Sequence, residues 1–357
     1  MTAGGGSHPQ RRPLGTVSLE KIALAHGGGG KAMRDLIDDV FVRAFDNALL
    51  APLGDQAQIP LAALSGHGDR LAVTTDSYVV DPLFFPGGDI GKLAVCGTVN
   101  DLAVGGARTL YLTCGVIIEE GFPVEMLRRV ANSMAQSARA AGVSIITGDT
   151  KVVPRGACDK LFINTAGIGV IGRGIDLGAD KVRIGDAVLV SGLIGDHGAA
   201  ILGARGDLAL ASPIESDCAP LNGMIADLLA TCPSVRFMRD ATRGGIATVL
   251  NEVVVGSDIG IAIEERAIPM REEVRGFCEI LGLDPLYLAN EGKIVCILPD
   301  AEVAVALATL SRHRSGELAA VVGHVTADRP GRVIMRSVLG GHRIVDMLSG
   351  EQLPRIC

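Results

Sequence analysis

Cysteine is the last residue of the chain, in the closing run Leu353-Pro354-Arg355-Ile356-Cys357. A thiol at the end of a tail can reach several sites, and as thiolate it is a soft nucleophile and a reversible carrier of acyl-type groups. Pro354 removes a backbone donor, so we do not expect these residues to form a helix. The alternative is a frayed terminus that happens to end in cysteine. The tail therefore supplies one candidate catalytic residue, Cys357.

A second feature is a set of acidic residues, each at the end or edge of an apolar run: Asp55, Asp76, Asp101, Asp149 and Asp240. Carboxylates that meet at one edge of a sheet are natural ligands for Mg²⁺, which prefers hard oxygens and bridges substrate phosphates. Taken singly, each aspartate is more typical of a cap or a turn. Taken together they predict a metal–nucleotide site, with Asp76, Asp101, Asp149 and Asp240 as metal ligands. Their neighbours Asn100 and Thr150 belong to the same predicted site.

Basic and glycine-rich segments supply the matching phosphate contacts. The turn Arg243-Gly244-Gly245 precedes an expected helix, so it offers backbone N–H groups and a helix dipole to a phosphate. Lys151 is a second counter-charge. The run from His26 to Lys31 contains Gly28 and Gly29 and is suited to closing over phosphates, although its composition also fits a linker.

One further carboxylate, Glu291, stands in Asn290-Glu291-Gly292 directly before an expected strand. It can present its side chain to a ligand, while the alternative is an ordinary turn. His197, in Gly195-Asp196-His197-Gly198, is more typical of a helix start or a structural histidine than of a catalyst.

Two common nucleotide motifs are not supported. Gly167-x-Gly169-x-x-Gly172 matches the dinucleotide pattern, but another turn follows it where a helix should open. Neither Gly30-Lys31 nor Gly91-Lys92 has a glycine six places before its lysine, so we expect no Walker loop.

Composition narrows the class of protein further. The 357 residues are 48% hydrophobic with a net charge of −7, and no basic cluster exceeds Arg11-Arg12, which argues against nucleic acid as a partner. No run reaches the roughly 18 apolar residues of a membrane span. The eight cysteines include no CxxC pair, which argues against disulfides or zinc and favours a reducing cytoplasm.

Strand and helix signals alternate along the chain, which indicates an α/β fold. Strands are expected over 70–80, 110–118, 143–147, 161–171, 187–191, 259–263, 293–298 and 333–336. Helices are expected over 33–50, 89–104, 123–140, 221–229, 245–254, 272–281 and 301–313. With a break at Gly172-Arg173-Gly174, this predicts a disordered lead over 1–13, α/β domains over 14–172 and 173–345, and a mobile tail over 346–357 hinged at Ser349-Gly350.

Several motifs carry a resemblance, and they occur in this order along the chain: Thr75-Asp76-Ser77, Val99-Asn100-Asp101, Gly148-Asp149-Thr150-Lys151, Gly195-Asp196-His197-Gly198, Asp240-Ala241-Thr242-Arg243-Gly244-Gly245, Asn290-Glu291-Gly292 and the Pro-Arg-Ile-Cys ending. From about His26 to Cys357 the sequence resembles the HypE family of hydrogenase maturation factors, within the PurM-like ATP-dependent superfamily. The ending is the most specific of these motifs.

The resemblance implies two α/β halves, the first of which pairs with its twin to close a β-barrel across a homodimer. It implies that the carbamoyltransferase HypF loads a carbamoyl group onto Cys357. This chain, with ATP and Mg²⁺, then dehydrates the group to a thiocyanate. The cyano group passes to iron on the HypC–HypD complex, for a nickel–iron hydrogenase. Glu291 and Lys151 are the implied proton relay, and the choice between them stays open.

Two other classes of protein remain as alternatives. One is another PurM-like phosphotransferase, such as a selenophosphate synthetase or a thiamine-monophosphate kinase, neither of which needs a terminal thiol. The other is a non-catalytic thiol carrier in which the aspartates are structural.

Overall fold

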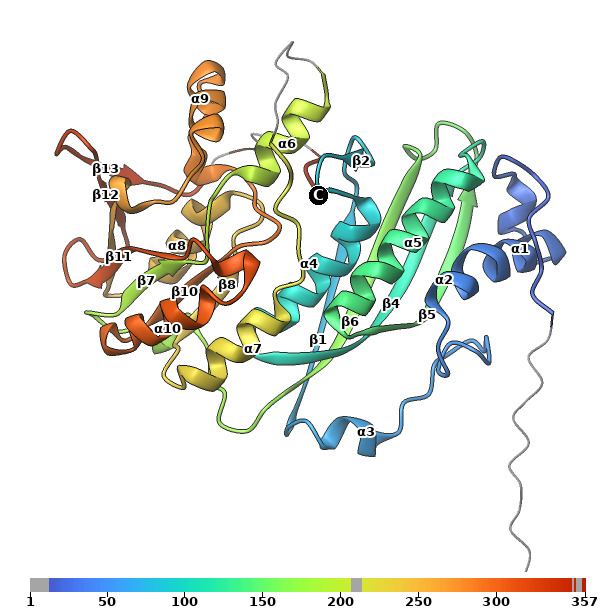
Figure 1. Cartoon of the computed structure of the whole chain (residues 1–357), viewed down its shortest axis with the longest axis horizontal. Helices are drawn as coiled ribbons and strands as arrows, with labels where there is room; N and C mark the ends of the chain where they lie inside the picture. Colours follow the sequence, from blue (N-terminus) through green and yellow to red (C-terminus); the bar gives the residue numbers. More distant parts are fainter. Residues whose placement is uncertain (1–12, 207–213, 349, 351–354) are drawn as a thin grey trace, which may run out of the picture.

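The structure is a computed structural model, and it describes residues 13–206, 214–348, 350 and 355–357. Apart from Pro13, the predicted lead over 1–13 lies outside these residues, as do residues 349 and 351–354 of the predicted tail. The described chain forms two halves, each with its own sheet (Figure 1). The expected fold of two α/β halves is therefore confirmed, while the exact domain limits stay a prediction.

The first half is built on a four-stranded sheet with the order β1-β6-β4-β5. Its strands are β1 (Arg70–Tyr78), β4 (Ala107–Glu119), β5 (Ser144–Val153) and β6 (Leu161–Ile171). Strands β4 and β5 run parallel, and β6 pairs antiparallel with both β1 and β4. The short pair β2 (Phe84–Phe85) and β3 (Gly88–Asp89) precedes the first long helix.

Helices α4 (Ile90–Val104) and α5 (Val124–Ala141) cover one face of this sheet (Figure 1). Helix α5 buries a stripe that includes Val130, Met134 and Ala138, and it ends at Gly142 with a left-handed φ of 69°. Almost every residue of α4 is buried, since it packs on the first sheet and also reaches the core of the second half. Gly97 lets α4 approach Tyr78 of β1, because any Cβ there would meet the tyrosine hydroxyl.

On the opposite face of the first sheet, apolar side chains are exposed in the described part of the chain. Leu71 and Val73 of β1 expose 61% and 65% of their surface, and Ile117 of β4 exposes 42%. Side chains alternate along a strand, so these apolar residues share one face. A large apolar face of this kind usually marks an interaction surface.

The second half is a seven-stranded sheet with the order β13-β12-β9-β11-β7-β10-β8. Its strands are β7 (Ala187–Val190), β8 (Phe237–Asp240), β9 (Gly260–Glu264), β10 (Ile294–Leu298), β11 (Ala320–Thr326), β12 (Val333–Arg336) and β13 (His342–Val345). Helix α8 (Gly245–Val254) packs on one face, and α7 (Asn222–Thr231) with α10 (Val303–Leu310) on the other. Because both faces are covered, β10 is an uninterrupted apolar run.

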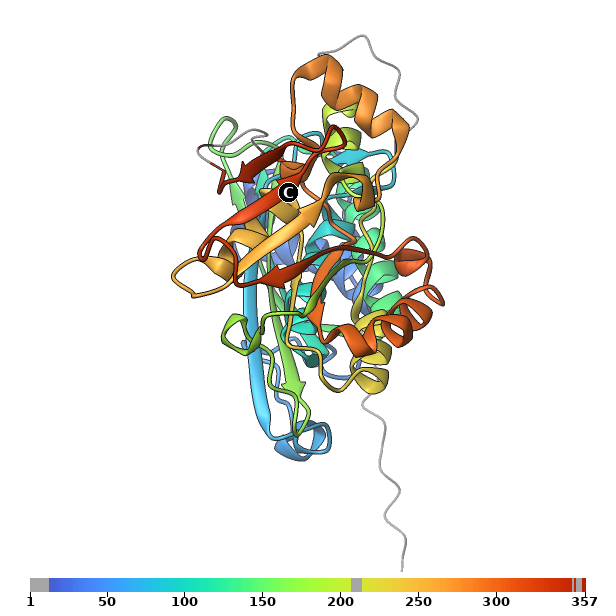
Figure 2. The same cartoon turned by 90° about the vertical axis from the view of Figure 1, so that its left-hand side faces the viewer.

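Two further helices, α6 (Asp196–Ala204) and α9 (Glu272–Leu281), lie together at one end of this half (Figure 1). Figure 2 looks at the second half, largely orange and red, with the blue and green strands of the first sheet beyond it. No helix among the described residues is long and apolar enough to cross a membrane.

The element predictions hold with a few corrections. The helix expected over 33–50 is too long: α1 (Lys31–Leu36), a π-helical turn (Ile37–Val42) and α2 (Arg43–Phe45) run on to Phe45 and stop there. The side chain of Asn47 ends it, because its Oδ1 accepts the backbone N–H groups of Leu49 and Leu50. The sequence did not predict the short helix α3 (Leu61–Ser65), helix α6 or the strands β2, β3, β8, β11 and β13.

Candidate active site

The end of the tail is docked on the first half. The backbone N–H of Val79 donates to a backbone oxygen of Cys357 at 3.2 Å, and that of Asp81 donates to the Arg355 carbonyl at the same distance. The Ile356 side chain is 4% exposed and belongs to the core of the first half, against which Cys357 also packs. As expected, Arg355–Cys357 are not helical. The mobility of the tail stays a prediction, and its hinge residue Ser349 lies outside the described residues.

Three of the predicted aspartates lie close together where the two halves meet. On β1, Thr74 and Asp76 face α4, and the Thr74 hydroxyl donates to Asp101 Oδ2 at 3.1 Å. Burial raises the Asp101 pKa to about 7, helped by the charges of Asp240 and Asp76. Burial also raises the pKa of Asp240, at the end of β8, and Asp76 adds to that effect. A cavity of about 360 Å³ opens beside Asp101 and Asp240.

Glu291 and Cys357 belong to the same neighbourhood. Glu291 is 3% exposed, and its Oε1 has no hydrogen-bond partner among the described residues. Burial raises its pKa well above the usual range, with further contributions from Asp240, Asp217 and Asp76. Burial also raises the pKa of the Cys357 thiol, and Glu291 is the largest charged contributor, while Arg243 opposes it. The terminal sulfur therefore lies within electrostatic range of Glu291, Asp76, Asp240 and Arg243.

Hydrogen bonds with Asn290 and Asp217 hold the loop that carries Glu291 in place. Asn290 Oδ1 accepts the Gly195 N–H at 2.7 Å, and its Nδ2 donates to the Ala241 carbonyl at 2.8 Å. Asp217 accepts the N–H groups of Glu291 and Gly292 at 3.0 and 3.1 Å. Sequence reasoning gave Asp217 no role, because nothing in its local sequence marks it.

Asn100, like Asn290, forms hydrogen bonds that join two segments of the chain. Its Nδ2 donates to the Ala219 carbonyl at 3.0 Å and its Oδ1 accepts the Leu221 N–H at 2.8 Å, which fastens α4 to the loop before α7. Its predicted contact with a nucleotide stays a prediction.

Asp149 and Lys151 lie elsewhere in the chain. They are on β5, at the opposite edge of the sheet from β1, and the register pairs Asp149 with Gly115 and Lys151 with Ile117. Both side chains are therefore on the uncovered face, where Lys151 Nζ lies 2.9 Å from Asp149 Oδ2. Within this chain the structure does not bring them to Cys357.

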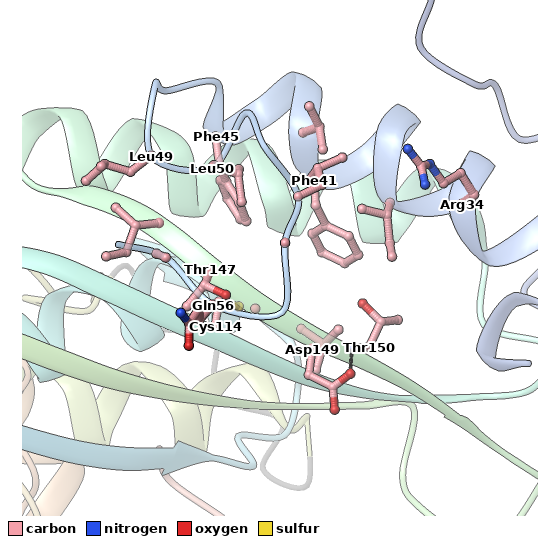
Figure 3. A pocket seen from close by; sticks show the side chains of 18 of the residues that line it. Arg34, Phe41, Phe45, Leu49, Leu50, Gln56, Cys114, Thr147, Asp149 and Thr150 are labelled. Carbon is pink, nitrogen blue, oxygen red and sulfur yellow. Dashed lines mark hydrogen bonds between the residues drawn. The ribbon is translucent and has the colours of Figure 1, made fainter. Parts of the chain in front are cut away.

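Thr150 points the other way, into a pocket of about 240 Å³ between β5 and the N-terminal helices (Figure 3). In Figure 3 the Thr150 side chain points toward Phe41, and Asp149 points away from the helices. Gly54 and Gln56, which flank the exposed Asp55, line this pocket, so Asp55 lies near Asp149 and Thr150 and not near Asp76.

The predicted glycines form tight turns. Gly244 and Gly245 have φ of 76° and 57°, a region that favours glycine, and they open directly into the first turn of α8. Gly28 and Gly29 follow a short 3-10 helix (Leu24–Gly27) that lies against β5 at Val152. The nucleotide roles of these glycines, of Arg243 and of Asp55 stay predictions.

The four predicted metal ligands do not form a ready-made cluster. Within the described ranges no group of three or more histidine, cysteine, aspartate or glutamate side chains is arranged to hold a metal ion. Asp76, Asp101 and Asp240 influence one another, whereas Asp149 has Lys151 as its partner. All eight cysteines are free thiols.

Comparison with known proteins gives a consistent result. Residues 54–171 match the family "AIR synthase related protein, N-terminal domain", and residues 183–336 match its C-terminal domain. Carbamoyl dehydratase HypE of Rhodobacter capsulatus is 59% identical over 95% of this chain and 98% of its own length.

Solved structures agree. The hydrogenase maturation protein HypE in complex with ATP is 52% identical with a TM-score of 0.88, over 94% of this chain and 99% of that one. The HypE–HypF complex contains a chain that is 45% identical with a TM-score of 0.75, over 89% of this chain and 100% of that one. Such identity over nearly the whole length separates this protein from the other PurM-like phosphotransferases. The chain belongs to the HypE family of carbamoyl dehydratases.

Proposed function

We propose that this chain uses ATP to dehydrate an S-carbamoyl group on Cys357 to a thiocyanate, the source of the cyanide ligands in nickel–iron hydrogenase maturation. Family membership supports the activity. The observation that carries the site is a buried glutamate with an unpaired oxygen, Glu291, whose charge acts on the Cys357 sulfur of the docked tail.

The chemistry requires a better leaving group than an amide oxygen. The carbamoyl oxygen attacks the γ-phosphorus of ATP, the bond to the ADP oxygen breaks, and one N–H proton is lost. The C–O bond then breaks as phosphate leaves, the second N–H proton is removed, and the carbon–nitrogen triple bond forms. Phosphoryl transfer of this kind depends mainly on position and on charge.

Glu291 is the better placed of the two predicted proton acceptors. A carbamoyl group on Cys357 would put its N–H groups next to the sulfur, where the unpaired Glu291 Oε1 can accept from them. Lys151 pairs with Asp149 on the other face of the sheet, so within one chain the contacts favour Glu291.

The nucleotide phosphates fit the turn Arg243-Gly244-Gly245 for two reasons. The charge of Arg243 lowers the pKa of the Cys357 thiol, so this cation is close to the reacting group. The turn also forms the N-terminus of α8, where backbone N–H groups can bind a phosphate. Asp76, Asp101 and Asp240 suit Mg²⁺, because burial and, to a smaller extent, their mutual repulsion raise the pKa of Asp101 and Asp240, and a divalent cation would relieve that repulsion. Mg²⁺ held there would offset charge on the transferring phosphoryl group.

A homodimer would cover the exposed face of the first sheet. Leu71, Val73 and Ile117 would be buried against the same face of a twin, and Asp149 and Lys151 would lie at that interface. We also propose HypF as the carbamoyl donor, given the solved HypE–HypF complex, and HypC–HypD as the iron-bearing acceptor. A cytoplasmic setting agrees with eight free thiols.

Replacing Glu291 by glutamine tests the assignment. We expect Glu291→Gln to accept the carbamoyl group and then retain it in the presence of ATP, measured by intact mass. Glu279→Gln, on the exposed surface of α9, is the matched control and should lose the mass of one water. Water loss in Glu291→Gln at the control rate would refute the role of Glu291.

A further inference from the structure

Both ends of helix α6 hold the C-terminal tail. His197 is in the first turn of α6 and is fully buried, with its Nε2 2.9 Å from the Ile356 carbonyl. Arg205 follows the last turn, and its Nη2 donates to the Arg355 carbonyl at 3.0 Å. Its Nε donates to the Asp81 carbonyl, so it joins the tail to the strand end on which the tail lies. Figure 1 shows the C-terminus beside α6 and β2.

The contact with His197 satisfies a carbonyl that nothing else in the described chain reaches. The Arg355 carbonyl and a backbone oxygen of Cys357 bond to Asp81 and Val79, while the Ile356 carbonyl between them is bonded by His197. Ile356 is buried, so without that donor its carbonyl would lose water and gain no partner. An unpaired buried carbonyl is costly, and the docked tail therefore depends on His197.

The Ile356 carbonyl can only accept, so it requires the hydrogen of His197 on Nε2, and Ser216 can support that tautomer by donating to Nδ1. The Ser216 hydroxyl oxygen accepts the Cys218 N–H at 3.1 Å and lies 2.8 Å from His197 Nδ1. Its own hydrogen is free to donate to that nitrogen. Burial lowers the His197 pKa, so the ring is neutral and has a single N–H. With Nδ1 as acceptor, the hydrogen is on Nε2 and donates to Ile356.

We propose that His197 is a positioning residue for the dehydration: with its tautomer supported by Ser216, it locks the tail so that the Cys357 sulfur stays at Glu291. This inference deepens the proposed function and rests on it for the chemistry. The docking step itself can be measured on the unmodified thiol, without HypF or ATP.

The test is the rate at which iodoacetamide alkylates Cys357, followed by peptide mass with the half-buried Cys158 as internal standard. We expect His197→Ala to raise the Cys357 rate by at least about tenfold relative to Cys158. His197→Gln should restore the slow rate, because its amide Nε2 donates from nearly the same place. Ser216→Ala should give a smaller rise, and His324→Ala, at an exposed histidine, should give none.

An unchanged Cys357 rate in His197→Ala would overturn the proposal, as would failure of His197→Gln to restore it. If His197→Ala unfolds, shown by alkylation of the buried Cys96, Ser216→Ala decides in its place: a rise supports the lock and no rise refutes it. With carbamoylated protein, His197→Ala should slow single-turnover thiocyanate formation while ATP affinity is unchanged. Altered alkylation with no thiocyanate even in the parent chain would contradict the proposed function and leave the lock standing.

Discussion

Truncating Ile356 to alanine should release the tail without disturbing the rest of the fold. Ile356 is the buried residue of the last three, Arg355–Cys357, and it fills space in the core of the first half. In the undocked state that side chain is in water whether it is isoleucine or alanine. The lost packing therefore falls almost wholly on the docking equilibrium.

The magnitude follows from burial. Replacing a buried isoleucine by alanine costs about 2–5 kcal/mol, through lost transfer free energy and the cavity left behind. At 1.36 kcal/mol for each factor of ten, the lower figure already shifts docking by about 30-fold. The shift is limited by the docking free energy itself, beyond which the tail is simply undocked.

Hydrogen exchange at the strand end measures this shift. The amides of Val79 and Asp81 donate to backbone oxygens of the tail, so undocking exposes both. We expect Ile356→Ala to lower their protection by about 30-fold or more. Ile344→Ala on β13 is the matched control, because Ile344 is 54% exposed and should change nothing. Unchanged protection at Val79 and Asp81 in Ile356→Ala would refute the docking contacts.

Four shorter predictions concern the sulfur, the metal, pH and assembly. Cys357→Ala should carry no carbamoyl group on any remaining cysteine, and peptide mapping that still finds one would rule out the terminal acceptor. Asp76→Asn or Asp240→Asn should keep a carbamoylated tail in the presence of ATP, because each variant loses the position of the metal and the phosphate but keeps the acceptor sulfur. Normal thiocyanate formation in both variants would make Asp76 and Asp240 ordinary turn residues. The pKa of the docked Cys357 thiol is raised above the ordinary 9.0, so docking is intact below pH 9 and weakens as the pH rises above 9. Above pH 9, trypsin should therefore cleave after Arg355 faster in the parent chain than in Cys357→Ser. Equal cleavage rates in the two chains would exclude the effect. Val73→Glu on the uncovered face should give a monomer by sedimentation, whereas Leu339→Glu, on a 95% exposed turn residue, should sediment as the parent does.

Much of the site could be predicted because its residues end apolar strands. Asp76 and Asp240 lie near the ends of the outer strands β1 and β8, Glu291 lies just before β10, and the tail that carries Cys357 docks after β1. Such positions show in the sequence as a carboxylate after or before an apolar run.

The rest depends on packing that local sequence does not encode. Asp149 also follows an apolar run, but the alternation of β5 turns it to the uncovered face, and only the register with β4 reveals that. His197 and Ile356 are 159 residues apart, so the local sequence of neither segment indicates that the two are in contact. Strand β11 was not predicted, because a bulge between Val321 and Gly323 interrupts the alternation of its side chains.

Intact mass spectrometry of the full chain tests the central claim most directly. After incubation with HypF and carbamoyl phosphate, the protein should gain one carbamoyl group. Addition of ATP and Mg²⁺ should then remove the mass of one water, with the change confined to the peptide that ends in Cys357, and a non-hydrolysable ATP analogue should remove none. Persistence of the carbamoyl mass with ATP and Mg²⁺ present, or loss of water without ATP, would contradict ATP-dependent dehydration on the terminal cysteine.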